Sequence, residues 1–173
     1  MKKNNPLGTK LSILLKNARI ESQGKDIGDL DNILSPANDE NDTVKRYNQA
    51  GLDYYHNERY EEAIEQFKKA LFLKPGDAKI HYNLGLTYDT LGHLDEALEK
   101  YRKAVQLDPM NADAHNNMGI IYYNNGLYEK AIAQFNKALK IDPNFNLARK
   151  NLKLIEEKRK LKEELSSHHP DDL

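Results

Sequence analysis

A period of 34 residues constrains the fold of this chain more than any other feature of its sequence. Pro75, Pro109 and Pro143 recur at that interval. Five further columns keep the same register and hold small or aromatic residues: Gly51, Gly85 and Gly119; Tyr54, Tyr88 and Tyr122; Ala63, Ala97 and Ala131; Phe67, Tyr101 and Phe135; and Ala70, Ala104 and Ala138. Six columns in one register predict three copies of a single structural unit.

Each unit contains two stretches with the spacing of an amphipathic helix. In the first unit, Tyr47, Ala50, Gly51 and Tyr54 occupy positions i, i+3, i+4 and i+7, which share one face of an α-helix. After a polar break at residues 56–59, a second stripe is formed by Ala63, Ile64, Phe67, Ala70 and Leu71. Each unit is therefore predicted to be two helices joined by a short turn.

The glycine and proline columns indicate how these helices meet and end. We expect Gly51 to face Ala63, because little side-chain bulk there lets the two backbones approach closely. Pro75 halts the second helix, since the residue before a proline avoids the α conformation. Asp77 follows and is expected to cap the next helix.

This pattern of columns resembles the tetratricopeptide repeat (TPR) family over about residues 44–145. The resemblance implies an all-α, right-handed α-solenoid of three helix-turn-helix units, at residues 44–77, 78–111 and 112–145. The bulky aromatic that often opens this repeat is Tyr47 once and is then replaced by histidine, at His81 and His115. We interpret the two histidines as filling that template position rather than as metal ligands.

Residues 146–166 are predicted to form a capping helix that begins in the register of a fourth first helix. Lys153 stands in the glycine column, so no second helix is expected to pack closely against it. Residues 167–173 are expected to be a disordered tail, and its histidines, His168 and His169, are not expected to form a stable metal site.

The N-terminal segment, residues 1–43, divides by charge. Residues 1–25 carry six positive charges and one negative, and residues 26–42 carry six negative charges and none positive. A short amphipathic helix is predicted first, from Leu7, Leu11, Leu14, Leu15 and Ala18, and a flexible acidic linker follows. We favour a helix that binds a partner, dimerises or folds back on the solenoid over one that lies on a membrane, since it lacks an aromatic anchor. Oligomers formed through this helix or the capping helix stay open as an alternative.

Composition and motif content argue against several classes of function. The net charge is −1, which removes the long-range field on which nucleic-acid binding relies. There is no cysteine, and the apolar run at residues 11–15 is too short for a signal or a membrane span. We therefore expect a cytoplasmic protein. Since no phosphate-binding glycine loop, zinc spacing or nucleophile motif occurs, we predict neither an enzyme nor a cofactor.

The first helices each leave a stripe opposite their buried face, and the resemblance places these stripes on a concave surface. The residues predicted to bind peptide there are Lys45, Asn48, Gln49 and Leu52 in the first unit; Lys79, Tyr82, Asn83 and Leu86 in the second; Asn116, Asn117 and Ile120 in the third; and Asn151 in the cap.

Within this set, Gln49, Asn83, Asn117 and Asn151 form a column that we call the amide ladder. A side-chain amide donates and accepts, so it can pair with the backbone of an extended peptide of any sequence. The alternative is that these amides bond to the neighbouring repeat or to water. A parallel column, formed by Leu52, Leu86, Ile120 and Leu154, is either helix packing or an apolar floor for ligand side chains.

A second binding mode of the family, the carboxylate clamp of cochaperones, requires cationic residues that this chain lacks. The corresponding positions hold Asn48, Leu52, Asn83, Asp113 and Asn117, and only Asn83 matches the pattern. A bound carboxylate would lose its charge-assisted hydrogen bonds here.

The sequence therefore predicts a non-enzymatic adaptor or scaffold that holds an extended peptide or a partner protein in its concave groove. Two alternatives are a chaperone similar to those of secretion systems and a self-assembling structural protein.

Overall fold

The computed structural model describes residues 40–167, with side chains described up to residue 164. The predictions for residues 1–39 and 168–173 lie outside this range. The described part consists of seven helices and no strands: α3 (Glu40–His56), α4 (Tyr60–Leu73), α5 (Ala78–Thr90), α6 (Leu94–Leu107), α7 (Ala112–Asn124), α8 (Tyr128–Ile141) and α9 (Asn146–Ser167). The all-α prediction is confirmed for these residues.

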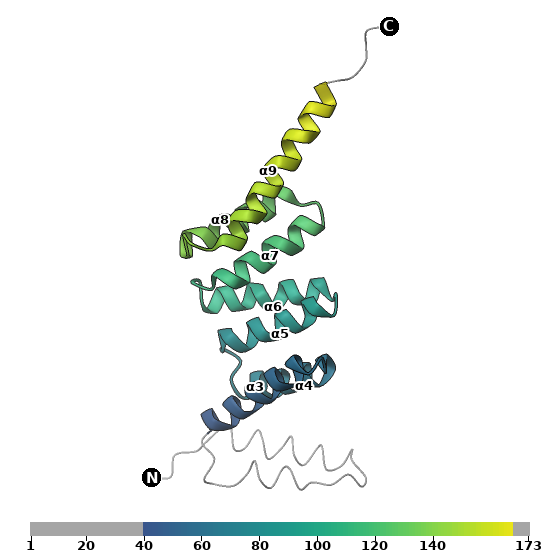
Figure 1. Cartoon of the computed structure of the whole chain (residues 1–173). Coiled ribbons are helices and arrows are strands. Elements are labelled where there is room, and N and C mark those ends of the chain that lie inside the picture. The colour runs from purple at the N-terminus through teal and green to yellow at the C-terminus, as the bar shows by residue number, and fades with distance from the viewer. Residues whose placement is uncertain (1–39, 168–173) are drawn as a thin grey trace, which may run out of the picture. The chain divides into compact units, whose positions relative to one another are not determined.

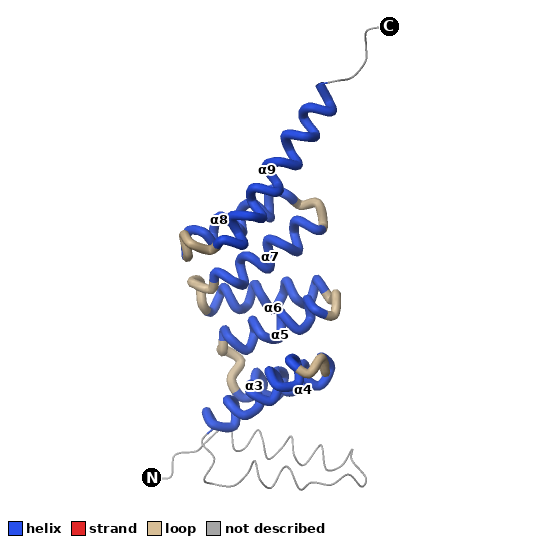
Figure 2. Tube along the Cα trace, viewed as in Figure 1, coloured by secondary structure: helices blue, strands red, loops and turns tan. Residues whose placement is uncertain are grey.

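The helices stack in the order of the sequence (Figure 1). The most extensive contacts join α3 to α4, α5 to α6, and α7 to α8, which are the three predicted helix pairs. Each pair also contacts the next one along the chain, and α9 packs on α8. Short loops separate the helices (Figure 2). Because the extensive contacts lie within a helix pair or between adjacent pairs, the described helices form a solenoid.

Two helix boundaries differ from the sequence-based expectation. Helix α3 begins at Glu40, so residues 40–43, which we expected in the acidic linker, are helical. Thr43 and Val44 are buried, and this burial extends the helix beyond the point at which the repeat pattern begins. Helix α9 ends at Ser167, one residue later than expected.

The glycine column makes room for the aromatic column rather than for the alanine column. A Cβ added at Gly51 would lie 2.5 Å from the ring of Phe67, and one added at Gly119 would lie 2.6 Å from the ring of Phe135. The expectation that Gly51 faces Ala63 did not include the ring of Phe67, which lies nearest to Gly51. Ala63 is fully buried all the same, as are the equivalent alanines of the other repeats, so both columns keep the helix pair close together.

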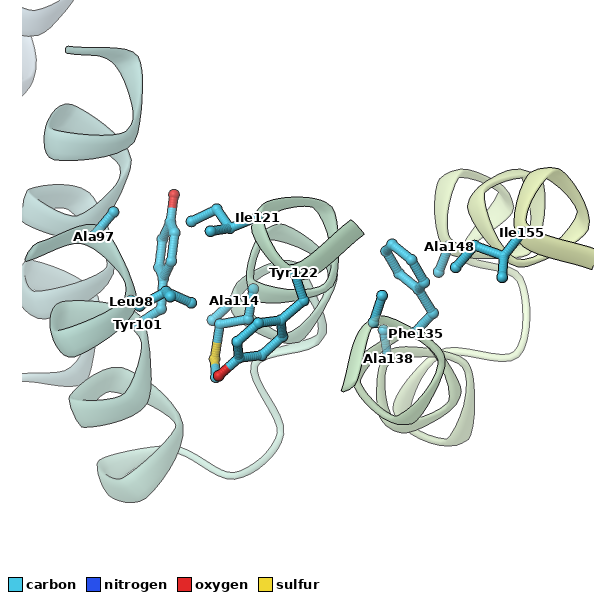
Figure 3. Packing of buried hydrophobic residues seen from close by; sticks show 12 residues of the cluster. Ala97, Leu98, Tyr101, Ala114, Ile121, Tyr122, Phe135, Ala138, Ala148 and Ile155 are labelled. Carbon is cyan, nitrogen blue, oxygen red and sulfur yellow. The ribbon is translucent and has the colours of Figure 1, made fainter. Parts of the chain in front are cut away.

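The aromatic column also reaches the following repeat. Figure 3 shows Tyr101 pointing from α6 toward Ile121 of α7, and Phe135 pointing from α8 toward Ala148 of α9. These residues belong to one core cluster that runs from Ala97 to Ile155. A second cluster fills the first repeat and reaches Leu84 of α5.

Local signals at the helix ends agree with the sequence. The side chain of Asp77 accepts hydrogen bonds from the backbone N–H groups of Lys79 and Ile80, which confirms the predicted cap. Two turns between paired helices contain glycines with positive φ, Gly92 at 76° and Gly126 at 74°. In the equivalent turn of the first repeat, Glu58 adopts a φ of 59°, which is unusual for a residue with a side chain.

Two alanines of α8 offer a test of this packing. Ala131 is fully buried, so Ala131→Leu should overpack the repeat and destabilise the protein by about 1–3 kcal/mol. Ala133→Leu makes the same change on the exposed side of the same helix and should leave stability nearly unchanged. Urea unfolding followed by circular dichroism measures both. Equal stability of the two variants would contradict the assignment of the buried face.

Candidate functional site

The stripe predicted to bind peptide lies on α3, α5, α7 and α9. Most of its polar members are half-buried rather than fully exposed, and so are the apolar residues Leu52, Leu86 and Ile120. Lys45 and Lys79 are exposed, and Lys45 pairs with Asp42 at 3.0 Å. Leu154 of α9 is 47% exposed, so the apolar column becomes more open at the cap.

Three members of the amide ladder are hydrogen-bonded to the preceding repeat. Asn83 Nδ2 donates to Asn48 Oδ1 at 3.1 Å, and Asn151 Nδ2 donates to Asn116 Oδ1 at 3.3 Å. Asn117 Nδ2 lies 3.5 Å from the hydroxyl of Tyr82 at the equivalent position. Each bond joins residues 35 apart in the sequence, which is one repeat plus one residue. The ladder therefore links the repeats and orients its own amides.

Gln49 is the exception, because no repeat precedes it among the described residues. Its side chain is exposed and donates to Asp53 of the same helix at 2.9 Å. The amides of the ladder are thus in two states: three are held between helices, and one lies on the surface.

Asn116 differs from the sequence-based expectation. The helical period places it on the open stripe, but its side chain is 1% exposed. Its Oδ1 accepts from Asn151 of α9, and its Nδ2 donates to Asn117 Oδ1 at 3.3 Å. The capping helix therefore covers this position, and Asn116 cannot contact a peptide without being uncovered.

A hydrogen-bond chain extends beyond the predicted residues. Asn117 Nδ2 also lies 3.3 Å from the hydroxyl of Tyr101, and that hydroxyl donates to Asp89 Oδ2 at 3.2 Å. The chain of donors runs from Asn151 through Asn116, Asn117 and Tyr101 to Asp89, and so connects α9 with α5. Our sequence reasoning missed Tyr101 and Asp89. One sequence feature could have revealed them: Tyr101 stands in a column that otherwise holds phenylalanine. A buried tyrosine hydroxyl needs a hydrogen-bond partner.

Burial is the largest influence on the pKa values of Tyr101, Asp89 and Tyr82. Burial raises the pKa of Tyr101, and the neighbouring Asp89 carboxylate raises it further. Burial likewise raises the pKa of Asp89, although the hydrogen bond from Tyr101 acts in the opposite direction. The pKa of Tyr82 is raised first by burial and then by the negative charge of Asp113. Both tyrosines therefore stay protonated and serve as hydrogen-bonding groups.

The two template histidines are buried and bonded to protein atoms. His81 Nε2 donates to the carbonyl of Pro75 at 2.9 Å, and His115 Nδ1 donates to Gln134 Oε1 at 2.8 Å. No group of three or more potential metal-binding side chains occurs in the part of the chain that the structure describes. None of the helices in that part combines the length and the apolar character needed to cross a membrane.

Comparison with known families agrees with this architecture. A model described as TPR repeat matches residues 51–92 and 90–126, and one described as tetratricopeptide repeat matches residues 112–145. The chain belongs to the tetratricopeptide repeat family. No curated protein sequence gives a significant match to this TPR chain.

Many solved structures share the TPR fold seen here. The Arabidopsis OM64 TPR domain matches with a TM-score of 0.67 and 20% identity, over 69% of this chain and 99% of that one. The first TPR of Spaghetti (RPAP3), bound to the HSP90 peptide SRMEEVD, matches with a TM-score of 0.65 and 22% identity, over 69% and 94%. At these identities the likeness concerns the fold alone.

Two further TPR structures are somewhat more similar in sequence. MamA matches with a TM-score of 0.65 and 27% identity, over 72% of both chains. YrrB, described as a TPR protein with an unusual peptide-binding site, matches with a TM-score of 0.60 and 28% identity, over 64% of this chain and 57% of that one.

Asp89 allows the hydrogen-bond chain to be tested through pH. Because the pKa of Asp89 is raised in the folded state, the native protein binds its proton more tightly than the unfolded chain does. This contribution to stability is therefore present at low pH and is lost as the pH rises through the folded-state pKa. Asp89→Asn keeps an acceptor for Tyr101 without the charge.

We expect Asp89→Asn to raise the melting temperature relative to wild type at pH 7. The difference should shrink as the pH falls from the folded-state pKa of Asp89 toward the ordinary aspartate value of about 3.9. Differential scanning calorimetry across this range measures it. A difference that does not change with pH would contradict the raised pKa.

Proposed function

We propose that this TPR solenoid is a non-enzymatic protein-interaction module, an adaptor or scaffold, that binds an extended peptide or a segment of a partner protein. The proposed site is the concave surface formed by the first helices, α3, α5, α7 and α9. The observation that carries the proposal is the amide ladder, in which the half-buried amides of Asn83, Asn117 and Asn151 recur every 34 residues and bond to the preceding repeat.

The bonds to the preceding repeat leave Asn83 and Asn151 able to bind. An asparagine amide has two N–H donors and an acceptor oxygen. Asn83 and Asn151 each use one N–H toward the neighbouring helix, and neither Oδ1 accepts a hydrogen bond from any residue in the range 40–164. A peptide backbone offers the matching carbonyl and N–H groups. Orienting bonds of this kind reduce the entropy that is lost when the peptide binds.

The apolar column would add a second contribution to peptide binding. Leu52, Leu86 and Ile120 are half-buried beside the ladder, so each combines packing with a partly exposed surface. Ligand side chains placed there would gain about 25 cal/mol per Å² of apolar surface removed from water. Backbone pairing with the ladder would then give affinity, and the apolar column would select among side chains.

Two structural relatives support peptide binding as the function. The RPAP3 domain was solved with a bound peptide, and YrrB is described as having a peptide-binding site. The carboxylate clamp is not the mode proposed for this chain. Asn48 is engaged by Asn83, and Asp113 places a negative charge close enough to Tyr82 to raise its pKa.

The test uses peptides selected on the wild-type protein from a random linear display library and synthesised with free and amidated C-termini. Asn83→Ala combined with Asn117→Ala should weaken binding by about 5- to 150-fold, since two amide pairs contribute about 0.5–1.5 kcal/mol each. Affinity should depend little on salt and on the free C-terminus, because neutral amides make the contacts. Isothermal titration measures each binding constant below the melting transition.

Asn136→Ala is the matched control for this experiment. It removes an exposed amide of α8 that lies outside the stripe, so it should leave both stability and peptide binding nearly unchanged. If the double variant binds as tightly as wild type, or if Asn136→Ala weakens binding equally, the ladder does not hold the peptide.

A further inference from the structure

A second surface of α7 borders a cleft of about 650 Å³ that the amide ladder does not reach. The cleft lies between α6, the loop that follows it, α7 and α8. Its apolar lining comes from Val105, Pro109, Met110, Met118 and Ile141. Met110 is 66% exposed, so a large apolar side chain faces water at the edge of the cleft.

The cleft and the ladder use opposite sides of the same helix. At about 100° per residue, the mean direction of His115 and Met118 of the cleft lies roughly 160° from the mean direction of Asn117 and Ile120 of the stripe. A ligand in the cleft would therefore leave the ladder uncovered, and the two surfaces can be tested separately.

The charged residues of the cleft are all positive. Arg102, Lys137 and Lys140 line it, and no carboxylate does. None of the three forms an ion pair with another residue between positions 40 and 164. In a chain with 26 basic and 27 acidic residues, this is a local excess of positive charge beside an apolar floor. Such an excess attracts an acidic ligand.

Part of the cleft wall is held in place by hydrogen bonds. Arg102 Nη2 donates to the hydroxyl of Tyr122 at 2.9 Å. Gln134 Oε1 accepts from His115, which leaves the NH₂ group of Gln134 for another acceptor. With Gln106, the cleft therefore offers two side-chain amides as well as cations and an apolar floor.

The repeat template does not require this combination. One repeat earlier, the positions of Met110 and Lys140 hold Gly76 and Gln106. The exposed methionine and a cation at the position of Lys140 are therefore particular to the junction between the second and third repeats, whereas Lys100 stands one repeat before Gln134.

We propose that this cleft binds an acidic peptide segment of a partner protein that carries at least one large apolar side chain. The apolar side chain would occupy the floor, where methionine adapts to different shapes. Carboxylates of the ligand would pair with Arg102, Lys137 and Lys140, and the amides would pair with its backbone. A peptide fits the two amides better than a lipid chain does, because a hydrocarbon chain offers them no partner.

The probe is a fluorescent nine-residue peptide in which Glu-Leu-Asp occurs three times, with both ends blocked. Fluorescence anisotropy at low salt should show saturable binding to the wild-type protein that weakens as salt is added. Lys137→Glu combined with Lys140→Glu should reduce the affinity about fivefold or more. Met110→Gly with Lys140→Gln should also reduce it, and this pair installs residues that the preceding repeat already accommodates.

Two controls separate this site from general charge attraction and from the ladder. Arg46→Glu with Lys160→Glu makes the same change in net charge at exposed positions outside the cleft, and it should leave the affinity within about twofold of wild type. Asn83→Ala with Asn117→Ala should also leave the affinity of the acidic peptide within about twofold of wild type. Backbone amide shifts in NMR should change around the cleft-lining residues of α6, α7 and α8.

The proposal would be overturned if no saturable binding occurred at protein concentrations up to about 1 mM. This concentration is far above the dissociation constant expected of a specific site. It would also be overturned by an equal loss of affinity in the charge control, which would indicate a nonspecific effect. Amide shifts confined to α3 and α5 would likewise contradict it.

Discussion

The fit of one aromatic ring against one glycine is the contact on which this solenoid depends. Within each repeat the ring from the second helix occupies space that a Cβ at the glycine would take, at 2.5–2.8 Å. Figure 3 shows the rings of Tyr101 and Phe135 pointing onward to the next helix pair, and Phe67 shares a core cluster with Leu84 of α5. Each ring therefore joins three helices, and close packing leaves little room for a change in side-chain volume. The orientation of the first helices, and so of the ladder, follows from this contact.

The ladder shows how a structural role and a binding role can share one set of side chains. An amide that only stabilised the stack could be fully enclosed, as Asn116 is. Asn83, Asn117 and Asn151 are instead half-buried, with Nδ2 directed to the preceding repeat. Their orientation is set before a ligand arrives, and this arrangement favours recognition of a backbone.

The repeat itself was predictable, because glycine, alanine and aromatic residues recur at one interval and each has a packing reason to do so. The cap at Asp77 was predictable from local chemistry. The partners of the amides were not, because helical periodicity assigns a residue to a face but does not say which neighbour covers it. Asn116 illustrates this limit, since its burial depends on the position of α9. The start of α3 at Glu40 was missed because residues 40–43 precede the repeat pattern.

The direction of the hydrogen bonds in the ladder has a consequence for any ligand. Asn83, Asn117 and Asn151 all donate toward the preceding repeat, and within residues 40–164 none of them donates toward a following helix. The surface therefore has a direction along the stack, because its amide donors all point the same way. A peptide backbone is also polar, with N–H and carbonyl groups that exchange places when the chain is reversed. Parallel and antiparallel orientations of a bound segment are thus inequivalent on this surface, even for a sequence that reads the same in both directions.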